Sequence, residues 1–151
     1  MPTVTVGDLL DRGREFEARL EAYYAKIRDR SQDNEVRLLT YYLARHCRHQ
    51  DQVMATYDKT QVANLRKAEV THDVVFESEK HFPLLGRRPE GVTGEELLQA
   101  ALKYDQTLIV LYRSILEQPI DDELRVMVES LIRVEERDIV MMKKMIAMHY
   151  F

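Results

Sequence analysis

The sequence predicts an all-α protein, an antiparallel four-helix bundle in which two repeated helix hairpins are joined by one long crossover. Apolar residues recur at helical spacing in four stretches. The 151 residues include only 5 Gly and 4 Pro, which leaves long stretches free to be helical. Residues 5–54 also align without a gap to residues 93–142. We therefore expect residues 1–151 to form a single domain.

The first hairpin is expected over residues 5–58. Thr5 is the predicted N-cap of its first helix, and apolar side chains follow at Leu9, Leu10, Phe16, Leu20, Tyr24 and Ile27. The polar run SQDN at 31–34 ends this helix. A second helix then carries one continuous stripe of side chains: Val36, Leu39, Leu43, Cys47, Gln50 and Met54.

The crossover is expected over residues 60–92, because its pattern is less regular. VANLRKA at 62–68 has no decisive periodicity, and KHFPLLGRRPEG at 80–91 reads as a loop.

The second hairpin is expected over residues 93–150. Thr93 and Glu96 form a predicted capping box, and the third helix should run from about 95 to 117, where Pro119 ends it. The fourth should run from about 122 to 150 with a stripe of its own: Leu124, Met127, Leu131, Glu135, Asp138, Met142 and Met145.

An offset of 88 residues relates the two hairpins. Twelve of the fifty aligned pairs are identical, whereas chance would give roughly three. The identical pairs include the caps Thr5 and Thr93 and the linker residues Asp33 and Asp121. One helix hairpin therefore occurs twice in this chain.

The repeat also aligns polar residues that stand on the apolar stripes. Glu17 aligns with Asp105, and the remaining pairs are Cys47 with Glu135 and Gln50 with Asp138. We expect all six side chains to point toward the bundle axis. A carboxylate in a dry core must be neutralised or bound to a cation. These residues therefore indicate a metal ion, shared protons or water inside the bundle.

All four helices resemble those of the ferritin-like superfamily, in particular its rubrerythrin-type members. EARLEAYY (17–24) and DQTLIVLY (105–112) resemble the first and third helices of that family. DNEVRLLTYYLARHCRHQ (33–50) resembles the second, and ELRVMVESLIRVEERD (123–138) the fourth. The resemblance implies a di-iron site made from one Glu on each of two helices and Glu-x-x-His on each of the other two.

Both Glu-x-x-His motifs are altered in this chain. The second helix has Cys47-x-x-Gln50, and the fourth has Glu135-x-x-Asp138. The resemblance therefore implies a degenerate site formed by Glu17, Cys47, Gln50, Asp105, Glu135 and Asp138. Such a site would hold one divalent ion, Fe²⁺, Mn²⁺ or Mg²⁺, or none.

His46 and His49 lie beside Cys47 but are not expected to be ligands. On a continuous helix they would stand about 100° and 160° around the axis from Cys47, toward a neighbouring helix or solvent. Their partners in the repeat are Val134 and Arg137. A register shift of one residue is the alternative, and it would turn His46-x-x-His49 inward.

Three functions follow from these patterns. The leading expectation is a weak divalent-metal-binding or non-catalytic interaction protein, which leaves enzymatic activity open. The first alternative is a di-iron oxidoreductase, a peroxide reductase or ferroxidase with unusual ligands and a separate protein as electron donor. The second is a metal-free structural or regulatory bundle.

Composition bears on compartment and partners. The net charge of −4 favours neither nucleic acid nor an anionic membrane. The single Cys47 and the absence of a signal-like pattern in MPTVTVGD predict a cytoplasmic protein. The second hairpin replaces four polar or small residues of the first with Ile109, Val110, Ile139 and Val140. Either the crossover or a second copy of the chain must then cover the third and fourth helices, and we favour a homodimer through them.

Overall fold

The structure is a computed structural model that describes residues 4–148 except 71–81, 83 and 85–87. It is mostly helical, as the sequence predicts. The helices are α1 (Val6–Arg30), α2 (Asn34–His46), α3 (His49–Met54), α4 (Lys59–Lys67), α5 (Gly94–Leu116) and α6 (Asp122–Ala147). Two short strands, β1 (Val4–Thr5) and β2 (Glu69–Val70), pair in antiparallel fashion.

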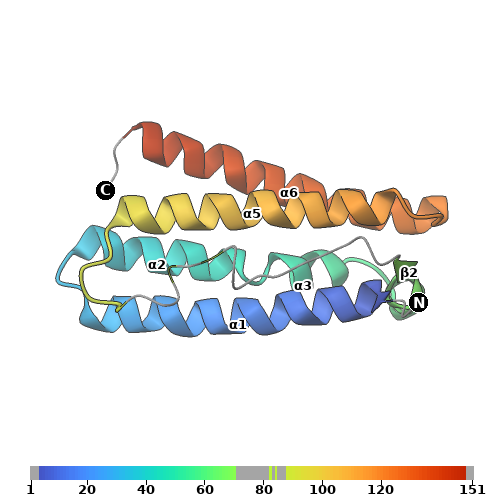
Figure 1. Cartoon of the computed structure of the whole chain (residues 1–151), viewed down its shortest axis with the longest axis horizontal. Helices are drawn as coiled ribbons and strands as arrows, with labels where there is room; N and C mark the ends of the chain where they lie inside the picture. Colours follow the sequence, from blue (N-terminus) through green and yellow to red (C-terminus); the bar gives the residue numbers. More distant parts are fainter. Residues whose placement is uncertain (1–3, 71–81, 83, 85–87, 149–151) are drawn as a thin grey trace.

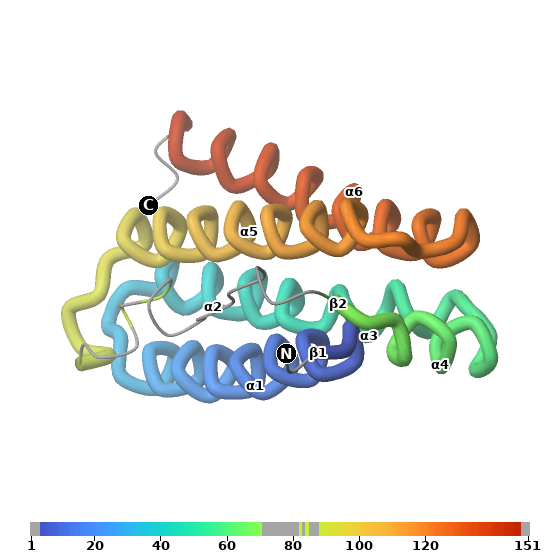
Figure 2. The backbone as a smooth tube through the Cα atoms, turned by 45° about the vertical axis from the view of Figure 1, so that its right-hand side comes forward, coloured from blue at the N-terminus to red at the C-terminus, as the bar shows by residue number. Residues whose placement is uncertain are grey.

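The long helices form two antiparallel hairpins that lie against each other. Helix α1 packs on α2, and α5 packs on α6 (Figure 1). Helix α5 runs alongside the first hairpin, whereas α6 diverges from α5 toward its C-terminal end (Figure 2). The two-plus-two arrangement of helices follows the short connections within each hairpin.

The helix starts agree with the predicted repeat. Helices α1 and α5 begin 88 residues apart, and so do α2 and α6. Thr5 and Thr93 each close a capping box, in which the threonine side chain and the third helical residue satisfy each other's backbone N–H groups. Asp33 and Asp121 likewise cap the second helix of each hairpin. The same local signals therefore start the same elements twice.

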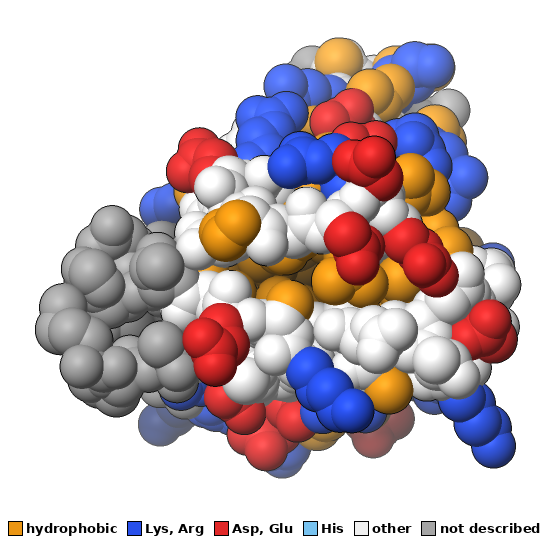
Figure 3. Space-filling view, turned by 90° about the vertical axis from the view of Figure 1, so that its right-hand side faces the viewer, with side chains coloured by type: hydrophobic (Ala, Val, Ile, Leu, Met, Phe, Trp, Pro, Cys, Tyr) orange, Lys and Arg blue, Asp and Glu red, His pale blue; other side chains and the backbone are white. Residues whose placement is uncertain are grey.

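The apolar stripes meet in one core between the hairpins. Ile27 and its repeat partner Ile115 are fully buried. Phe16 contacts its own repeat partner Tyr104, with ring centroids 5.0 Å apart. A contact between two residues at matched positions of the repeat is expected where the two hairpins face each other. At the end where α5 turns into α6, hydrophobic side chains line the seam between the halves, with charged side chains around them (Figure 3).

The second helix of the first hairpin is not continuous, which corrects the sequence expectation. Helix α2 ends at His46, Cys47 and Arg48 form a turn, and α3 begins at His49. The matched segment of α6 continues unbroken. Polar contacts to α1 hold α3 in its own position: the Arg48 Nε–H donates to Glu21 at 2.9 Å, and the Gln50 side chain donates to the Leu10 carbonyl at 3.3 Å.

The undecided stretch of the crossover is largely helical. Helix α4 begins at the capping residue Asp58 and buries Leu65 completely. Arg66 forms a two-pronged ion pair with Asp11 of α1, with distances of 3.0 and 2.8 Å. The expected loop at 80–91 falls largely outside the described residues, so its conformation stays a prediction.

The surface of the second hairpin bears on the predicted dimer. Of the four residues behind that prediction, Ile109 is buried and Ile139 is partly buried within the same chain. Val110 and Val140 are exposed, at 64% and 52%. The exposed valines leave a homodimer as a prediction.

None of the helices described is both long and apolar enough to span a bilayer.

We expect the protein to sediment as a dimer, and a Val110→Glu/Val140→Glu variant to sediment as a monomer. Two charges placed in an apolar contact would be desolvated without partners. Analytical ultracentrifugation of both proteins tests this. Leu38→Glu on α2, also strongly exposed, is the control and should stay dimeric. A wild-type protein that is monomeric at every concentration would refute the dimer.

Candidate metal centre

Polar side chains are buried at the middle of the molecule, where the repeat predicts them. Glu17, Gln50, Asp105, Glu135 and Asp138 are each only 5–6% exposed. They come from α1, α3, α5 and α6. Cys47 is partly buried. The sequence therefore locates the polar centre of the bundle, although it does not give the contacts within it.

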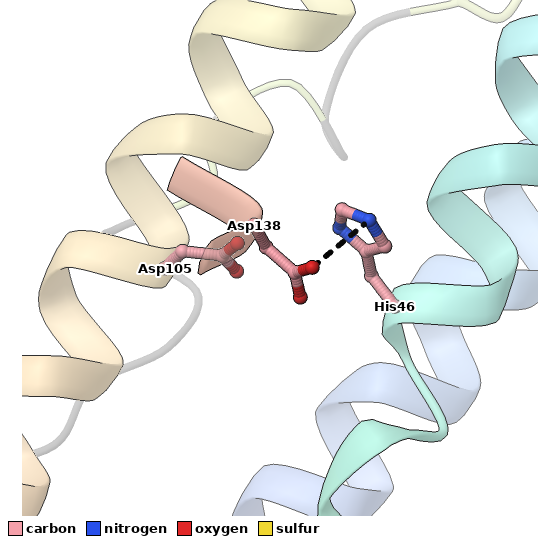
Figure 4. Close-up of side chains that lie close together, drawn as sticks. All are labelled: His46, Asp105 and Asp138. Atoms are coloured by element: carbon pink, nitrogen blue, oxygen red, sulfur yellow. Dashed lines mark ion pairs between the residues drawn. The ribbon is translucent and has the colours of Figure 1, made fainter. Parts of the chain in front are cut away.

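Three residues form the most compact group of ligand atoms. His46 at the end of α2, Asp105 of α5 and Asp138 of α6 each offer one atom, and these atoms all lie within 4.8 Å of one another. We call this group the triad. Asp138 and His46 face each other from opposite sides, with Asp105 beside Asp138 (Figure 4). Imidazole nitrogen and carboxylate oxygen are ligands that first-row divalent ions accept.

Both histidines contact the centre, which corrects the expectation that they lie on the flank or in solvent. His49 Nδ1 lies 2.7 Å from Asp138 Oδ2, and His46 Nε2 lies 3.6 Å from Asp138 Oδ1. Their side chains are only 17% and 11% exposed. The turn at Cys47 and Arg48 is the reason, because angles measured along a continuous helix do not hold across it. The pair His46-x-x-His49 thus faces inward, as the alternative of a one-residue register shift also predicts.

Gln50 is buried, and its side-chain amide donates to the Leu10 carbonyl of α1. This bond joins α3 to α1 one residue after His49. The predicted role of Gln50 as a metal ligand stays a prediction.

The carboxyl groups are held in an environment that favours their protonated forms. Burial raises the pKa of both Glu17 and Asp105 well above their usual values. The charge of Glu135 is the next largest cause for each of them. Burial and the charge of Asp138 raise the pKa of Glu135 to about 7. Asp105 Oδ2 is buried with no hydrogen-bond partner. A cation would relieve both the repulsion and the unsatisfied oxygen.

His46 is neutral near neutral pH. Burial lowers its pKa to about 4, although the charge of Asp138 acts in the opposite direction. Its contact with Asp138 is therefore an approach of a neutral ring to a carboxylate rather than an ion pair. A neutral imidazole keeps a lone pair, which is the form that binds metal ions.

A small cavity adjoins the triad. Its volume is about 20 Å³, enough for roughly one water molecule. His46 and Asp105 line it together with Glu17, Leu20, Tyr24, Leu43, Cys47, Ala101 and Tyr104. Burial raises the pKa of the Cys47 thiol, so this group is protonated when no cation is nearby. The cavity therefore has room for one water molecule or one ion beside the triad.

The pKa shifts predict that the metal-free protein loses stability as the pH rises from about 6.5 to about 8. The folded protein keeps the Glu135 proton up to about pH 7, whereas the unfolded chain loses it near the ordinary pKa of 4.5. The stability that the bound proton contributes is therefore lost as the pH rises through about 7. Glu17 and Asp105 shift in the same direction. The lowered pKa of His46 acts in the opposite direction and offsets part of this loss close to pH 6.5.

Glu135 alone should contribute a loss of about 1 kcal/mol over this interval. Urea unfolding of EDTA-treated protein at both pH values measures it. Glu135→Gln should flatten the dependence. A stability that rises with pH would contradict the pKa assignment.

Comparisons of the chain with models of protein families, with curated proteins and with solved structures found no match.

Proposed function

We propose that this protein binds a divalent transition-metal ion, Fe²⁺ or Mn²⁺, between its two hairpins, in a bundle of ferritin-like type. The observation that carries the proposal is the triad, in which atoms of His46, Asp105 and Asp138 lie within 4.8 Å of one another. The burial of Asp105 and Asp138, with His46 partly buried beside them, gives a second reason. A buried group of carboxylates is costly unless a cation compensates it.

The residues around the triad suit such an ion. His49 holds Asp138 in place through a 2.7 Å contact, as supporting residues around metal ligands commonly do. Glu17 and Glu135 supply further buried carboxyl groups within the same electrostatic environment. Imidazole among the ligands favours Fe²⁺ or Mn²⁺ over Mg²⁺, which prefers oxygen ligands and water.

The ligand types support the resemblance to ferritin-like proteins, although the ligands are distributed differently between the two hairpins. The family pattern places one imidazole on each hairpin. Here both imidazoles, His46 and His49, belong to the first hairpin, and both residues of the Glu135-x-x-Asp138 motif are acidic. Four carboxyl groups and two imidazoles are still present, so the total matches the family's ligand set although the order differs.

We expect Mn²⁺ to raise the melting temperature of protein purified without a metal-affinity tag. An ion at 100 times its Kd stabilises the folded state by about 2.7 kcal/mol, or roughly 5–10 °C for a chain of this size. Differential scanning calorimetry measures the shift. Asp138→Asn should abolish it, whereas Asp51→Asn, at an exposed ion pair with Arg14, should preserve it.

Equal melting temperatures with Mn²⁺, Fe²⁺, Zn²⁺ and EDTA would contradict the proposal. That result would favour the metal-free structural or regulatory bundle.

A di-iron oxidoreductase is the second candidate, and the inward position of the histidines favours it. Such an enzyme requires imidazole beside the carboxylates, and both His46 and His49 contact Asp138. Loading the protein with two equivalents of Fe²⁺ per chain without oxygen and then admitting air distinguishes the candidates. Rapid stoichiometric oxidation would support the enzyme, with a separate protein as electron donor. Iron that stays ferrous would support binding alone.

A further inference from the structure

The cavity beside the triad contains a ligand type that the triad lacks. Cys47 lines it together with Glu17, His46 and Asp105. These side chains provide sulfur, nitrogen and carboxylate oxygen, which are the ligand types that zinc accepts. His46 and Asp105 already belong to the triad, whereas Glu17 and Cys47 are brought near them by the cavity alone. Asp105 points to a ligand independently of the cysteine, because its buried Oδ2 has no hydrogen-bond partner.

His46 and Asp105 belong to both the triad and the cavity. An ion bound by these two residues can therefore complete its coordination on either side. On one side the next ligand is Asp138, a hard oxygen donor. On the other side the next ligands are Glu17 and the Cys47 sulfur, which soft and borderline ions prefer.

The Cys47 side chain lines the cavity and is held there by no strong hydrogen bond among the described residues. Its Sγ makes only a weak 3.6 Å hydrogen bond with the Leu43 carbonyl. Cys47 also lies in the turn between α2 and α3 rather than inside a helix. Rotation about its Cα–Cβ bond therefore breaks no strong contact.

We propose that the cavity is a second position for the ion, in which the Cys47 thiolate replaces Asp138, and that thiophilic divalent ions such as Zn²⁺ and Co²⁺ occupy it. This proposal rests on the proposed function, because it uses two residues of the triad. When the metal–sulfur bond forms, the S–H bond breaks and its proton passes to solvent, with no change of oxidation state. The centre would thus sort ions by their ligand preference.

Cobalt(II) absorption tests the proposal, because a thiolate ligand adds a near-ultraviolet charge-transfer band to the visible bands of the ion. Cys47 is the only cysteine of the chain, so the band can come from no other residue. We expect the wild type to show both kinds of band. Cys47→Ser should lose the charge-transfer band and at least about 100-fold in Co²⁺ affinity, since loss of a mere supporting residue already costs 10–100-fold. Asp51→Asn, at the exposed ion pair with Arg14, should keep both the charge-transfer band and the Mn²⁺ affinity.

The matched variant is Asp138→Asn, which should lose Mn²⁺ binding and keep the charge-transfer band. Visible Co²⁺ bands without a charge-transfer band would overturn the cavity proposal while leaving the proposed function intact. A charge-transfer band that vanishes on dilution would also overturn it, because the thiolate would then bridge two copies. Binding of neither Co²⁺ nor Mn²⁺ would refute both proposals. Circular dichroism of Cys47→Ser and Cys47→Ala verifies that the variants fold.

Discussion

A His46→Ala/His49→Ala variant is expected to lose Mn²⁺ affinity by more than about 100-fold while keeping its helical fold. His46 is one of the three triad residues, and His49 fixes the orientation of Asp138. Removal of both rings takes away a neutral nitrogen ligand and the support of an oxygen ligand together. Isothermal titration calorimetry measures the affinity, and far-ultraviolet circular dichroism verifies the fold.

Arg45→Ala is the matched control for this variant. Arg45 is an exposed residue of α2 that lies next to His46 in sequence. Its loss should leave Mn²⁺ affinity nearly unchanged. Unchanged affinity in the double histidine variant would show that the imidazoles are not part of the centre and would restore the original interpretation of them as flank residues.

The second large effect is a gain in stability. Asp105→Asn is expected to stabilise the metal-free protein by about 1 kcal/mol or more near pH 8, because a neutral amide removes the cost of keeping a buried carboxyl group whose pKa is raised. Asp105 is 5% exposed, and the charges of Glu135 and Asp138 repel it. The same substitution should abolish stabilisation by Mn²⁺, since it removes a triad ligand.

Urea unfolding with and without Mn²⁺ measures both effects of Asp105→Asn. Glu136→Gln is the control, because Glu136 lies next to Glu135 in sequence but is half exposed and pairs with Arg113 at 3.6 Å. We expect it to change stability little. A destabilised Asp105→Asn protein that still responds to Mn²⁺ would show that Asp105 is a structural residue rather than a ligand.

The helices and the buried carboxylates could be predicted from the sequence because both follow from periodicity and repetition. Thr5 and Thr93 start equivalent helices, and the stripes predicted which faces are buried. The repeat then identified Glu17 and Asp105 as an inward pair, and both are buried. Such local signals survive in the folded chain because tertiary packing agrees with them.

The roles of the histidines could not be predicted, because they depend on a helix break without a local signal. No Gly or Pro stands between His46 and His49, so the pattern favours a continuous helix. The break goes with contacts to α1 from Arg48 and Gln50, which are distant in sequence from their partners. A two-residue turn is enough to bring His46 and His49 to Asp138 while Gln50 stays buried and Cys47 lines the cavity. The centre therefore retains two imidazoles.

Anomalous diffraction from crystals grown with Mn²⁺ tests the central claim most directly. A peak within about 2.0–2.6 Å of His46 Nε2 and of one carboxylate oxygen each from Asp105 and Asp138 is the predicted result. Manganese found only on the outer surface, with the three side chains keeping their contacts to one another, would contradict an ion-binding centre between the hairpins.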